Sequence, residues 1–251
     1  MKIKSLILCG GPGTRLRPIT YYFQKAMIPV GLKQKPLLEY VVRLMRYYGI
    51  KDLAFLVSYK AEQIVNYFND GSRFGMKISY VYDDPKLKGT GGSVLNAFRK
   101  GAIDIEDILL IYYGDILSNI NLKDLLHYHE SKGASATVAL ASNFTVKVGL
   151  ADIDENFRIH GFVEKPKLEK PVSIGILVFN GEVLEEMEKI KKKRGIDLMG
   201  DVIPHLIKIG KPVYGYLTNV FWYDVGSIEA YEKLDHKLIE KLMAPFFENK
   251  I

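Results

Sequence analysis

A short apolar run that ends in a glycine-rich loop is the feature that most constrains this chain. Residues Leu6–Cys9 are apolar without a break, and Gly10, Gly11 and Gly13 follow almost at once. A run this short and this apolar is typical of a strand buried on both faces, as in a parallel sheet. Glycines permit a tight turn and let backbone N–H groups approach an anion closely. The stretch therefore predicts a phosphate-binding loop at the carboxyl end of a first strand.

Two cations follow the glycines. Arg15 carries a planar fork that matches phosphate oxygens, and Lys25 carries a mobile point charge. Two common phosphate loops are excluded. The dinucleotide fingerprint requires a glycine where Leu16 stands, which disfavours a nucleotide-dependent oxidoreductase, and the Gly-Lys-Ser/Thr of the P-loop is absent. The alternative, a plain glycine-rich turn with two solvated cations, is weakened by both charges and by the motifs further along.

Composition and charge are those of an ordinary globular protein with anionic partners. The chain has 251 residues, 48% of them hydrophobic and 25% charged, and a net charge of +6 spread along its length. A diffuse positive charge suits anionic substrates. The cluster Lys191–Arg194 is typical of a solvated helix end, so we expect no nucleic-acid partner.

The lone cysteine, Cys9, sits in the apolar run and permits no disulfide within the chain, which fits a reducing compartment. The first residues show no signal-peptide pattern, and no apolar run approaches the roughly 18 residues that span a bilayer. We therefore expect a cytoplasmic protein with no membrane partner.

The first half of the chain alternates between strand and helix patterns. The expected strands are 6–9, 53–57, 78–82 and 108–113, and the expected helices are 36–48, 61–68, 94–99 and 121–132. This alternation predicts a doubly wound α/β sheet. His127 and His129 lie on different faces of the last helix, and both are predicted to be surface residues.

Two of these strands end in residues suited to binding. Gly89–Gly92 follows the third strand, and Asp115 directly follows the fourth. Open α/β sheets bind ligands outside the carboxyl ends of their strands, and an aspartate is a hard oxygen donor suited to Mg²⁺. Taken alone, each feature has an ordinary alternative, a helix-entry turn and a capping aspartate.

The second half of the chain lacks the regular strand–helix alternation of the first half. A hairpin is expected from 148–153 and 158–164 around a polar turn, with further strands at 136–141, 173–179 and 213–217. Helices are expected at 183–191, 201–209 and 228–242. No internal repeat and no hexapeptide repeat are visible.

Five motifs in order resemble the sugar nucleotidyltransferases, which join a nucleoside triphosphate to a sugar 1-phosphate and release pyrophosphate. They are Gly10–Leu16 with Lys25, Gly89–Gly92, Gly114-Asp115, Glu164-Lys165-Pro166 and Trp222–Ser227. The resemblance runs from Leu6 to about Tyr231. It implies one nucleotidyltransferase domain over 1–251 without a C-terminal β-helix. The implied fold is an α/β, Rossmann-like, doubly wound mixed sheet with an antiparallel sugar-binding extension.

The resemblance also implies a role for each motif residue. Catalytic roles fall to Arg15, Lys25, Asp115 and Asp224, with Asp115 and Asp224 as ligands of Mg²⁺. The nucleotide-binding residues would be Cys9, Gly10, Gly11, Gly13, Thr14, Tyr82, Gly89 and Thr90. The residues that bind the sugar phosphate would be Gly149, Glu164, Lys165 and Gly175.

Two departures from the family pattern stand out. The family usually has Pro-Lys-Pro where this chain has Gln24-Lys25-Ala26, and often Tyr-Gly where it has Val148-Gly149. The expected substrate is a hexose 1-phosphate, glucose or mannose, with the base left open. Two rivals share the fold, a non-catalytic subunit that binds a nucleotide sugar and an enzyme acting on a phosphate such as phosphocholine. A homo-oligomer is also possible, with Pro245–Phe247 either at an interface or packed within the chain.

Overall fold

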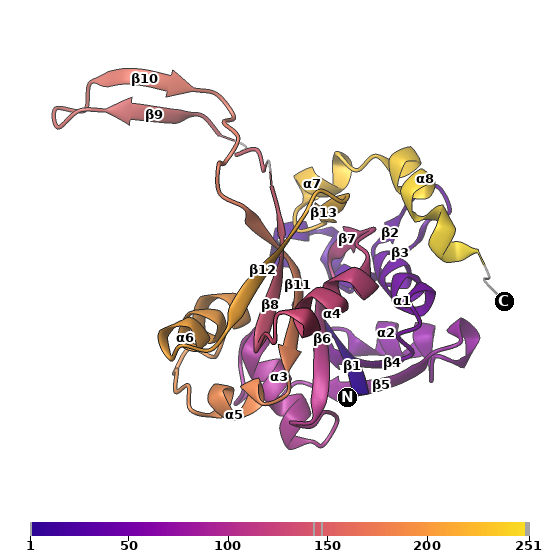
Figure 1. Cartoon of the computed structure of the whole chain (residues 1–251). Helices are drawn as coiled ribbons and strands as arrows, with labels where there is room; N and C mark the ends of the chain where they lie inside the picture. The colour runs from indigo at the N-terminus through magenta and orange to yellow at the C-terminus, as the bar shows by residue number, and fades with distance from the viewer. Residues whose placement is uncertain (1, 143, 147, 249–251) are drawn as a thin grey trace.

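The computed structural model describes residues 2–142, 144–146 and 148–248 and is built around one seven-stranded sheet (Figure 1). The strand order is β12-β8-β11-β6-β1-β4-β5. The strands are β1 Lys2–Cys9, β4 Asp52–Val57, β5 Lys77–Tyr82, β6 Asp107–Tyr113, β8 Ala136–Ala141, β11 Val172–Asn180 and β12 Val213–Thr218.

The first half of the chain forms the parallel part of this sheet. Strand β1 lies between β4 and β6, and β5 pairs with β4, all in parallel. The connecting helices are α1 Leu37–Tyr47, α2 Ala61–Phe68 and α3 Thr90–Arg99. Because the strands run in one direction, their carboxyl ends open at a single edge of the sheet, where ligands bind in folds of this kind.

Both faces of the central strands are covered, which explains why β4, β6 and the second half of β1 are apolar without alternation. One core packs the sheet against α1, α2, α4 Leu122–Ser131 and α8 His236–Phe247. The other packs it against α3, α5 Val183–Glu188 and α6 Ile203–Lys208. Strand β11 runs antiparallel to both β6 and β8, whereas β12 pairs with β8 in parallel. The predicted doubly wound mixed sheet is therefore confirmed.

Three small sheets complete the fold. Strand β13 Trp222–Asp224 pairs with β7 Ile116–Ser118, and β2 Pro29–Val30 pairs with β3 Lys35–Pro36. Strands β9 Leu150–Ile153 and β10 Ile159–Val163 form the predicted hairpin. Figure 1 shows this hairpin projecting from the body of the molecule.

Several predicted helix boundaries were wrong. Helix α3 begins at Thr90, so the second glycine loop forms its first turn. The helix expected at 201–209 is a π-helical turn, Leu198–Val202, followed by α6. The helix expected at 228–242 is two helices, α7 Ile228–Glu232 and α8, because the Asp235 side chain accepts hydrogen bonds from two backbone N–H groups and caps the second. The helix expected at 183–191 ends at Glu188.

The prediction for His129 was also wrong, because its side chain is buried beneath α4. Its Nδ1 lies 2.8 Å from Thr137 Oγ1 and its Nε2 lies 3.2 Å from Asn180 Oδ1. Burial lowers the pKa of His129, so the ring ties the helix to the sheet as a neutral group.

The aromatic end of the chain packs within the molecule. Phe246 lies against Tyr47 and Phe247 against Tyr40, with ring centroids 5.0 and 4.9 Å apart. These contacts join α8 to α1, which is one of the two alternatives that the sequence left open. In the part of the chain that the structure describes, no helix is both long and apolar enough to cross a membrane.

Candidate active site

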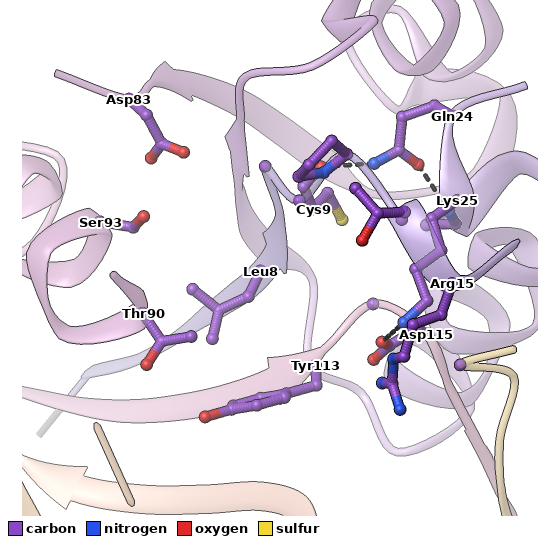
Figure 2. A pocket seen from close by; sticks show the side chains of 18 of the residues that line it. Leu8, Cys9, Arg15, Gln24, Lys25, Asp83, Thr90, Ser93, Tyr113 and Asp115 are labelled. Atoms are coloured by element: carbon purple, nitrogen blue, oxygen red, sulfur yellow. Dashed lines mark hydrogen bonds and ion pairs between the residues drawn. The ribbon is translucent and has the colours of Figure 1, made fainter. Parts of the chain in front are cut away.

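The carboxyl ends of the parallel strands open into a cavity of about 500 Å³, the first cavity (Figure 2). Its lining includes most of the predicted nucleotide residues. They are Cys9, Gly10, Gly11, Gly13, Thr14, Gly89 and Thr90, and the predicted catalytic residues Arg15, Lys25 and Asp115 line the same cavity. The structure thus brings together residues that lie more than a hundred positions apart in the sequence, as the parallel arrangement predicts.

The first glycine loop is held in a conformation that only glycine tolerates. Gly13 has a φ of +59°, and a Cβ there would meet the Thr20 methyl at 2.9 Å and the Lys25 Cβ at 3.2 Å. The Thr20 hydroxyl donates to Gly13 O over 2.9 Å. A 3-10 turn, Thr14–Leu16, then presents Arg15 to the cavity.

Lys25 is positioned by the glutamine that precedes it. Gln24 is buried; its Nε2 donates to Cys9 O and its Oε1 accepts from Ala26 N. Its own N–H donates to Gln63 Oε1 over 2.7 Å. The lysine ammonium pairs with the Asp115 carboxylate inside the cavity. In this chain, hydrogen bonds of Gln24 therefore hold the segment around Lys25 in place, where the family usually has prolines.

The second glycine loop packs against and is hydrogen-bonded to residues 196–198. Gly89 has a φ of +85°, and a Cβ there would lie 2.3 Å from Ile196 O. That carbonyl accepts from Gly91 N and Gly92 N over 2.8 and 3.2 Å. The Thr90 hydroxyl donates to Asp197 Oδ2 over 2.9 Å and accepts from Leu198 N over 2.8 Å.

Asp201 anchors this bracing segment. Its side chain is 2% exposed and accepts from Asp197 N over 2.9 Å, and it pairs with Lys192 and Arg194 over 3.2 Å each. The hydrogen bond from Asp197 N, helped by both cations, lowers the pKa of Asp201. Sequence reasoning missed this support, although the basic cluster beside it was visible.

A second cavity of about 550 Å³ adjoins the first. The two share Arg15, Tyr113 and Gly226 in their linings, and the second adds Gly175 and Asp224. A Cβ at Gly226 would lie 2.7 Å from Asp224 Oδ1 and 3.1 Å from Arg15 Nη2. The absence of that atom lets the carboxylate and the guanidinium approach at the junction of the two cavities.

The two predicted metal ligands lie in segments that the fold places side by side, Asp115 just before β7 and Asp224 at the end of β13. Asp224 pairs with Ile116 across β13 and β7, and Val225 N donates to Asp115 O over 3.1 Å. In the described residues, no group of three or more His, Cys, Asp or Glu forms a metal site. Two carboxylates nevertheless fit Mg²⁺, which is commonly held by one or two protein carboxylates together with substrate phosphates. The ammonium of Lys25 already shows that the Asp115 carboxylate receives a cation.

Four predicted residues are not brought to either described cavity lining. Glu164 and Lys165 lie at the base of the hairpin, with side chains 62% and 63% exposed and 3.7 Å apart. Gly149 faces Phe162 and Glu164 within the hairpin. Tyr82 is 53% exposed, and its carbonyl accepts from the Asn96 and Lys100 side chains.

Other cavity residues were not predicted. The first cavity also includes Leu8, Gln24, Asp83, Ser93 and Tyr113, and the second also includes Phe144, Val172, Ser173, Met199, Trp222 and Tyr223. Asp83 and Tyr113 stand at the carboxyl ends of β5 and β6, so strand position was a usable signal. Burial raises the pKa of the Asp83 carboxyl and raises that of Tyr113 to about 12.

Known proteins with similar sequences cover most of this chain. A UTP–glucose-1-phosphate uridylyltransferase from Synechocystis is 33% identical over 244 residues, 91% of this chain and 61% of the relative. A mannose-1-phosphate guanylyltransferase from Mycobacterium tuberculosis is 32% identical over 234 residues, 91% of this chain and 62% of the relative. The chain therefore spans about three fifths of the length of these relatives.

Solved structures share the fold. HddC from Yersinia pseudotuberculosis superposes with a TM-score of 0.70 at 21% identity, covering 92% of this chain and 97% of HddC. A solved Bacillus anthracis structure gives a TM-score of 0.73 at 21% identity, covering 99% of this chain and 97% of that one. The sequence itself matches the family described as Nucleotidyl transferase over residues 4–241. The chain belongs to that nucleotidyl transferase family, as its motifs predicted.

Proposed function

We propose that this protein joins a nucleoside triphosphate to a hexose 1-phosphate, giving a nucleoside-diphosphate sugar and pyrophosphate. The observation that carries the proposal is that two cavities of similar size meet at Arg15, Tyr113 and Gly226. Two substrates that react with each other need adjoining sites with a cation at the junction, and Arg15 supplies one.

The first cavity would hold the nucleoside triphosphate. The glycine loop offers backbone N–H groups, while Arg15 and Lys25 offer positive charge at one end of the cavity (Figure 2). In the present structure Lys25 is paired with Asp115, so a bound phosphate would compete with that carboxylate for the ammonium.

The second cavity would hold the sugar 1-phosphate. Gly175 has a φ of +74° and forms part of its lining, with polar Ser173 and aromatic Trp222 beside it. Lys165 would counter the charge of the attacking phosphate, and Glu164 would accept a hydrogen bond from a sugar hydroxyl. Both residues would reach the substrate from the hairpin, together with Gly149. The relatives named above act on glucose and mannose 1-phosphates, which makes a hexose the expected sugar.

The reaction requires no covalent intermediate with the protein. An oxygen of the sugar phosphate forms a bond to the α-phosphorus, the bond from that phosphorus to the bridging oxygen breaks, and pyrophosphate leaves with the electron pair. Arg15 and Lys25 would stabilise the negative charge that gathers on the leaving group. Asp115 and Asp224 would hold Mg²⁺, which when bound neutralises phosphate charge. The contribution of the protein is then alignment of two anions that repel each other in water.

The test is a substrate grid. Purified protein is incubated with Mg²⁺, five nucleoside triphosphates and the 1-phosphates of glucose, mannose and N-acetylglucosamine, and pyrophosphate is measured. Release that requires both substrates is the expected result. No release anywhere on the grid, from protein that binds a nucleotide sugar, would replace the proposal with a non-catalytic binding role. Release with phosphocholine in place of the sugar phosphate would correct the substrate class.

The lone cysteine bears on the cellular compartment of the protein. Cys9 is buried and unpaired, which fits a protein kept in a reducing environment. We propose a cytoplasmic location on this ground.

A further inference from the structure

A third cavity, of about 560 Å³, takes no part in the mechanism above. Helix α3 and the end of α5, which share one hydrophobic core, contribute to its walls (Figure 1). The acid in its lining is Glu188. The basic side chains in its lining are Lys86, Lys88, Arg99, Lys191, Lys192 and Lys193.

The fold concentrates in this cavity charges that are far apart in the sequence. Lys86 and Lys88 precede the second glycine loop, whereas the cluster Lys191–Lys193 follows α5. All three lysines of the cluster are exposed, as expected for a solvated helix end. The structure adds that they line the same cavity as the two lysines from the earlier segment. A cavity lined by charges of one sign attracts ligands of the opposite sign.

Most of these cations have no partner within the protein. The Arg99 guanidinium donates to the Glu188 carboxylate over 2.8 and 2.6 Å, and Lys192 pairs with Asp201 over 3.2 Å. Like charges around one cavity repel each other, and a bound polyanion relieves that repulsion. The side chains that form neither an ion pair nor a hydrogen bond with any described residue are Lys86, Lys88, Lys191 and Lys193.

The second glycine loop is the wall between the first and third cavities. Gly89, Thr90 and Ser93 line the first cavity, whereas Lys88 and Gly92 line the third. Neighbouring residues of one loop and one helical turn therefore face opposite cavities. A ligand in the third cavity would contact the reverse side of the loop that faces the nucleotide.

The segment 195–196, which also lines the third cavity, is bonded to this loop. Ile196 N donates to Lys88 O over 2.9 Å, and Ile196 O accepts from Gly91 N and Gly92 N. Gly195 has a φ of +103°, and a Cβ there would lie 2.5 Å from Lys88 O. Because the two backbones are in such close contact, a ligand that holds one of them in place also restrains the other.

We propose that the third cavity is an effector site for a small molecule with two or more phosphate groups, whose binding strengthens nucleotide binding in the first cavity. The coupling rests on the nucleotide-binding role proposed for the first cavity. Lysine ammonium groups bind phosphate oxygens as point charges, so the lining favours a high charge over a particular ligand shape. A single phosphate would leave most of the four unpaired ammonium groups without a partner.

The coupling follows from where the lysines lie. Phosphates held between Lys88 on the loop and Lys191 or Lys193 on the later segment would join the two parts of the wall. The loop would then be ordered before the nucleotide arrives. A ligand that binds the ordered loop more tightly than the free one shifts the population toward the form that binds nucleotide.

The probe for the experiment is 2,3-bisphosphoglycerate, which carries two phosphate groups and resembles neither a nucleotide nor a sugar 1-phosphate. It is titrated by calorimetry, at constant free Mg²⁺, into protein saturated with the tightest-binding of ATP, CTP, GTP, UTP and dTTP. Bisphosphoglycerate is expected to bind, and to bind more weakly as salt is raised. Inorganic phosphate is expected to bind at least about tenfold more weakly, because it contacts fewer ammonium groups.

A combined variant, Lys86→Ala with Lys88→Ala and Lys191→Ala, identifies the site. It is expected to bind bisphosphoglycerate at least about tenfold more weakly than the natural protein. Its affinity for nucleotide alone is expected to be unchanged, because none of these side chains lines the first cavity. Circular dichroism melting verifies that the variant is folded.

A second combined variant controls for net charge. Lys77→Ala with Lys237→Ala and Lys241→Ala removes the same charge from three exposed positions outside the third cavity. It is expected to bind bisphosphoglycerate as the natural protein does. An equal loss of affinity in both variants would mean that only the overall charge of the protein matters, and would overturn the proposed site.

The coupling is measured as the effect of bisphosphoglycerate on the dissociation constant for nucleotide. Saturating bisphosphoglycerate is expected to lower that constant at least about fivefold in the natural protein and to leave it unchanged in the Lys86, Lys88 and Lys191 variant. A rise in the constant that is equal in both proteins would mean competition for the first cavity and would overturn the inference. Binding of bisphosphoglycerate with no effect on nucleotide would reject the coupling.

The remaining outcomes separate this inference from the proposed function. Absence of bisphosphoglycerate binding, or equal binding by the Lys86, Lys88 and Lys191 variant, would reject the site and leave the proposed transfer standing. Tighter binding of a short single-stranded oligonucleotide, lost in the same variant, would assign the cavity to nucleic acid instead. Bisphosphoglycerate binding by a protein that binds no nucleotide would keep the site and reject the proposed function.

Discussion

Lys25 is the residue on which charge balance in the first cavity depends. Its ammonium is paired with Asp115, and both side chains are largely shielded from water, with 14% and 24% exposed. An ion pair in such a site gives the lysine two alternative partners, the carboxylate before substrate binds and a phosphate afterwards. The family position is kept although the flanking prolines are not, because Gln24 orders the same segment by hydrogen bonds.

We expect Lys25→Ala to lower kcat/KM for transfer by roughly 100-fold or more, the effect of removing one preorganised group that stabilises developing charge. The fold should persist, because the lysine contributes no apolar core. The measurement is steady-state pyrophosphate release with circular dichroism as the folding check. Lys208→Ala, at an exposed position on α6, is the control and should match the natural protein. Turnover within a few-fold of the natural enzyme would remove Lys25 from the mechanism.

Asp83 gives a stability prediction whose sign follows from its pKa. The folded-state pKa is raised, so the native state binds the proton more readily than the unfolded state. The cost of the ionised group is then fully present above the folded pKa and disappears as pH falls toward the usual carboxyl range. We expect Asp83→Asn to raise Tm at pH 7 by no more than about 2 °C, because solvent screens a carboxylate that is only partly buried.

The gain should shrink as the pH is lowered through the carboxyl range, because the natural protein is then neutral at this site as well. Thermal melts at several pH values measure it, with Asp84→Asn as the matched control. A variant less stable than the natural protein at pH 7 would mean that the ionised carboxylate has partners in solution that offset its burial.

Among single residues, those that directly follow an apolar strand or belong to a long motif were predicted as site residues. Asp115 was found because it directly follows an apolar strand, and Lys25 because it belongs to a long motif. Asp83 also follows a strand, yet the neighbouring Asp84 is equivalent in sequence. The three-dimensional structure distinguishes them, because Asp83 lines the first cavity whereas the Asp84 carboxylate accepts from Lys86 N in a loop turn.

At the scale of elements, the parallel strands were predictable and the helix junctions were not. Strands that are buried on both faces are apolar throughout. The buried parts of β1, β4 and β6 are therefore recognisable in the sequence as uninterrupted apolar runs. The junctions depend on local competition for backbone N–H groups. Asp235 divides α7 from α8, and Asp197 caps the π-helical turn, while apolar periodicity continues through both.

The segment 192–201 supports the second glycine loop, and its stability can be tested. Asp201 holds it by one backbone hydrogen bond and two ion pairs, and the segment in turn holds Gly89–Thr90. We expect Asp201→Ala to cost about 1–3 kcal/mol of unfolding free energy and to raise the dissociation constant for nucleotide, because the loop loses its support. Thermal melts and nucleotide titration measure the two effects separately.

Lys193→Ala is the control, since this residue is exposed in the same basic cluster but belongs to neither of the ion pairs of Asp201. The lowered pKa of Asp201 fixes the pH dependence: its stabilisation is present above the usual carboxyl pKa and is lost as pH falls through the folded value. A Tm loss in Asp201→Ala with unchanged nucleotide affinity would limit the residue to a structural role.

On the scale of the whole molecule, the hairpin is the part whose placement the sequence does not determine. Alternation and a polar turn predicted β9 and β10 themselves. Every residue of β9 is exposed, as are all of β10 except the partly buried Gly161. With no apolar face committed to the main core, its direction depends on the two connecting segments. The sheet and both cavities are complete without the hairpin (Figure 1).

Removal of the hairpin therefore separates folding from sugar recognition. Residues 149–165 are replaced by Gly-Gly, a join that the structure permits because Val146 N donates to Pro166 O over 2.9 Å and Thr145 bridges to Lys167. We expect Tm to change by no more than about 2 °C, since so little apolar area is buried. Nucleotide affinity should stay the same, while KM for the sugar 1-phosphate rises at least about tenfold, as the loss of a charge-assisted contact requires.

Lys165→Ala in the intact chain isolates the charge from the rest of the hairpin, and Lys170→Ala, beyond the replaced segment, is its control. If the deletion lowers Tm strongly, the hairpin packs against the body in solution and its exposure is not the resting arrangement. If KM for the sugar phosphate is unchanged in both the deletion and Lys165→Ala, the sugar site consists of the second cavity alone. A rise in KM in both, with the fold and nucleotide binding intact, would place the hairpin over the second cavity during turnover, because Lys165 reaches neither cavity in the arrangement described.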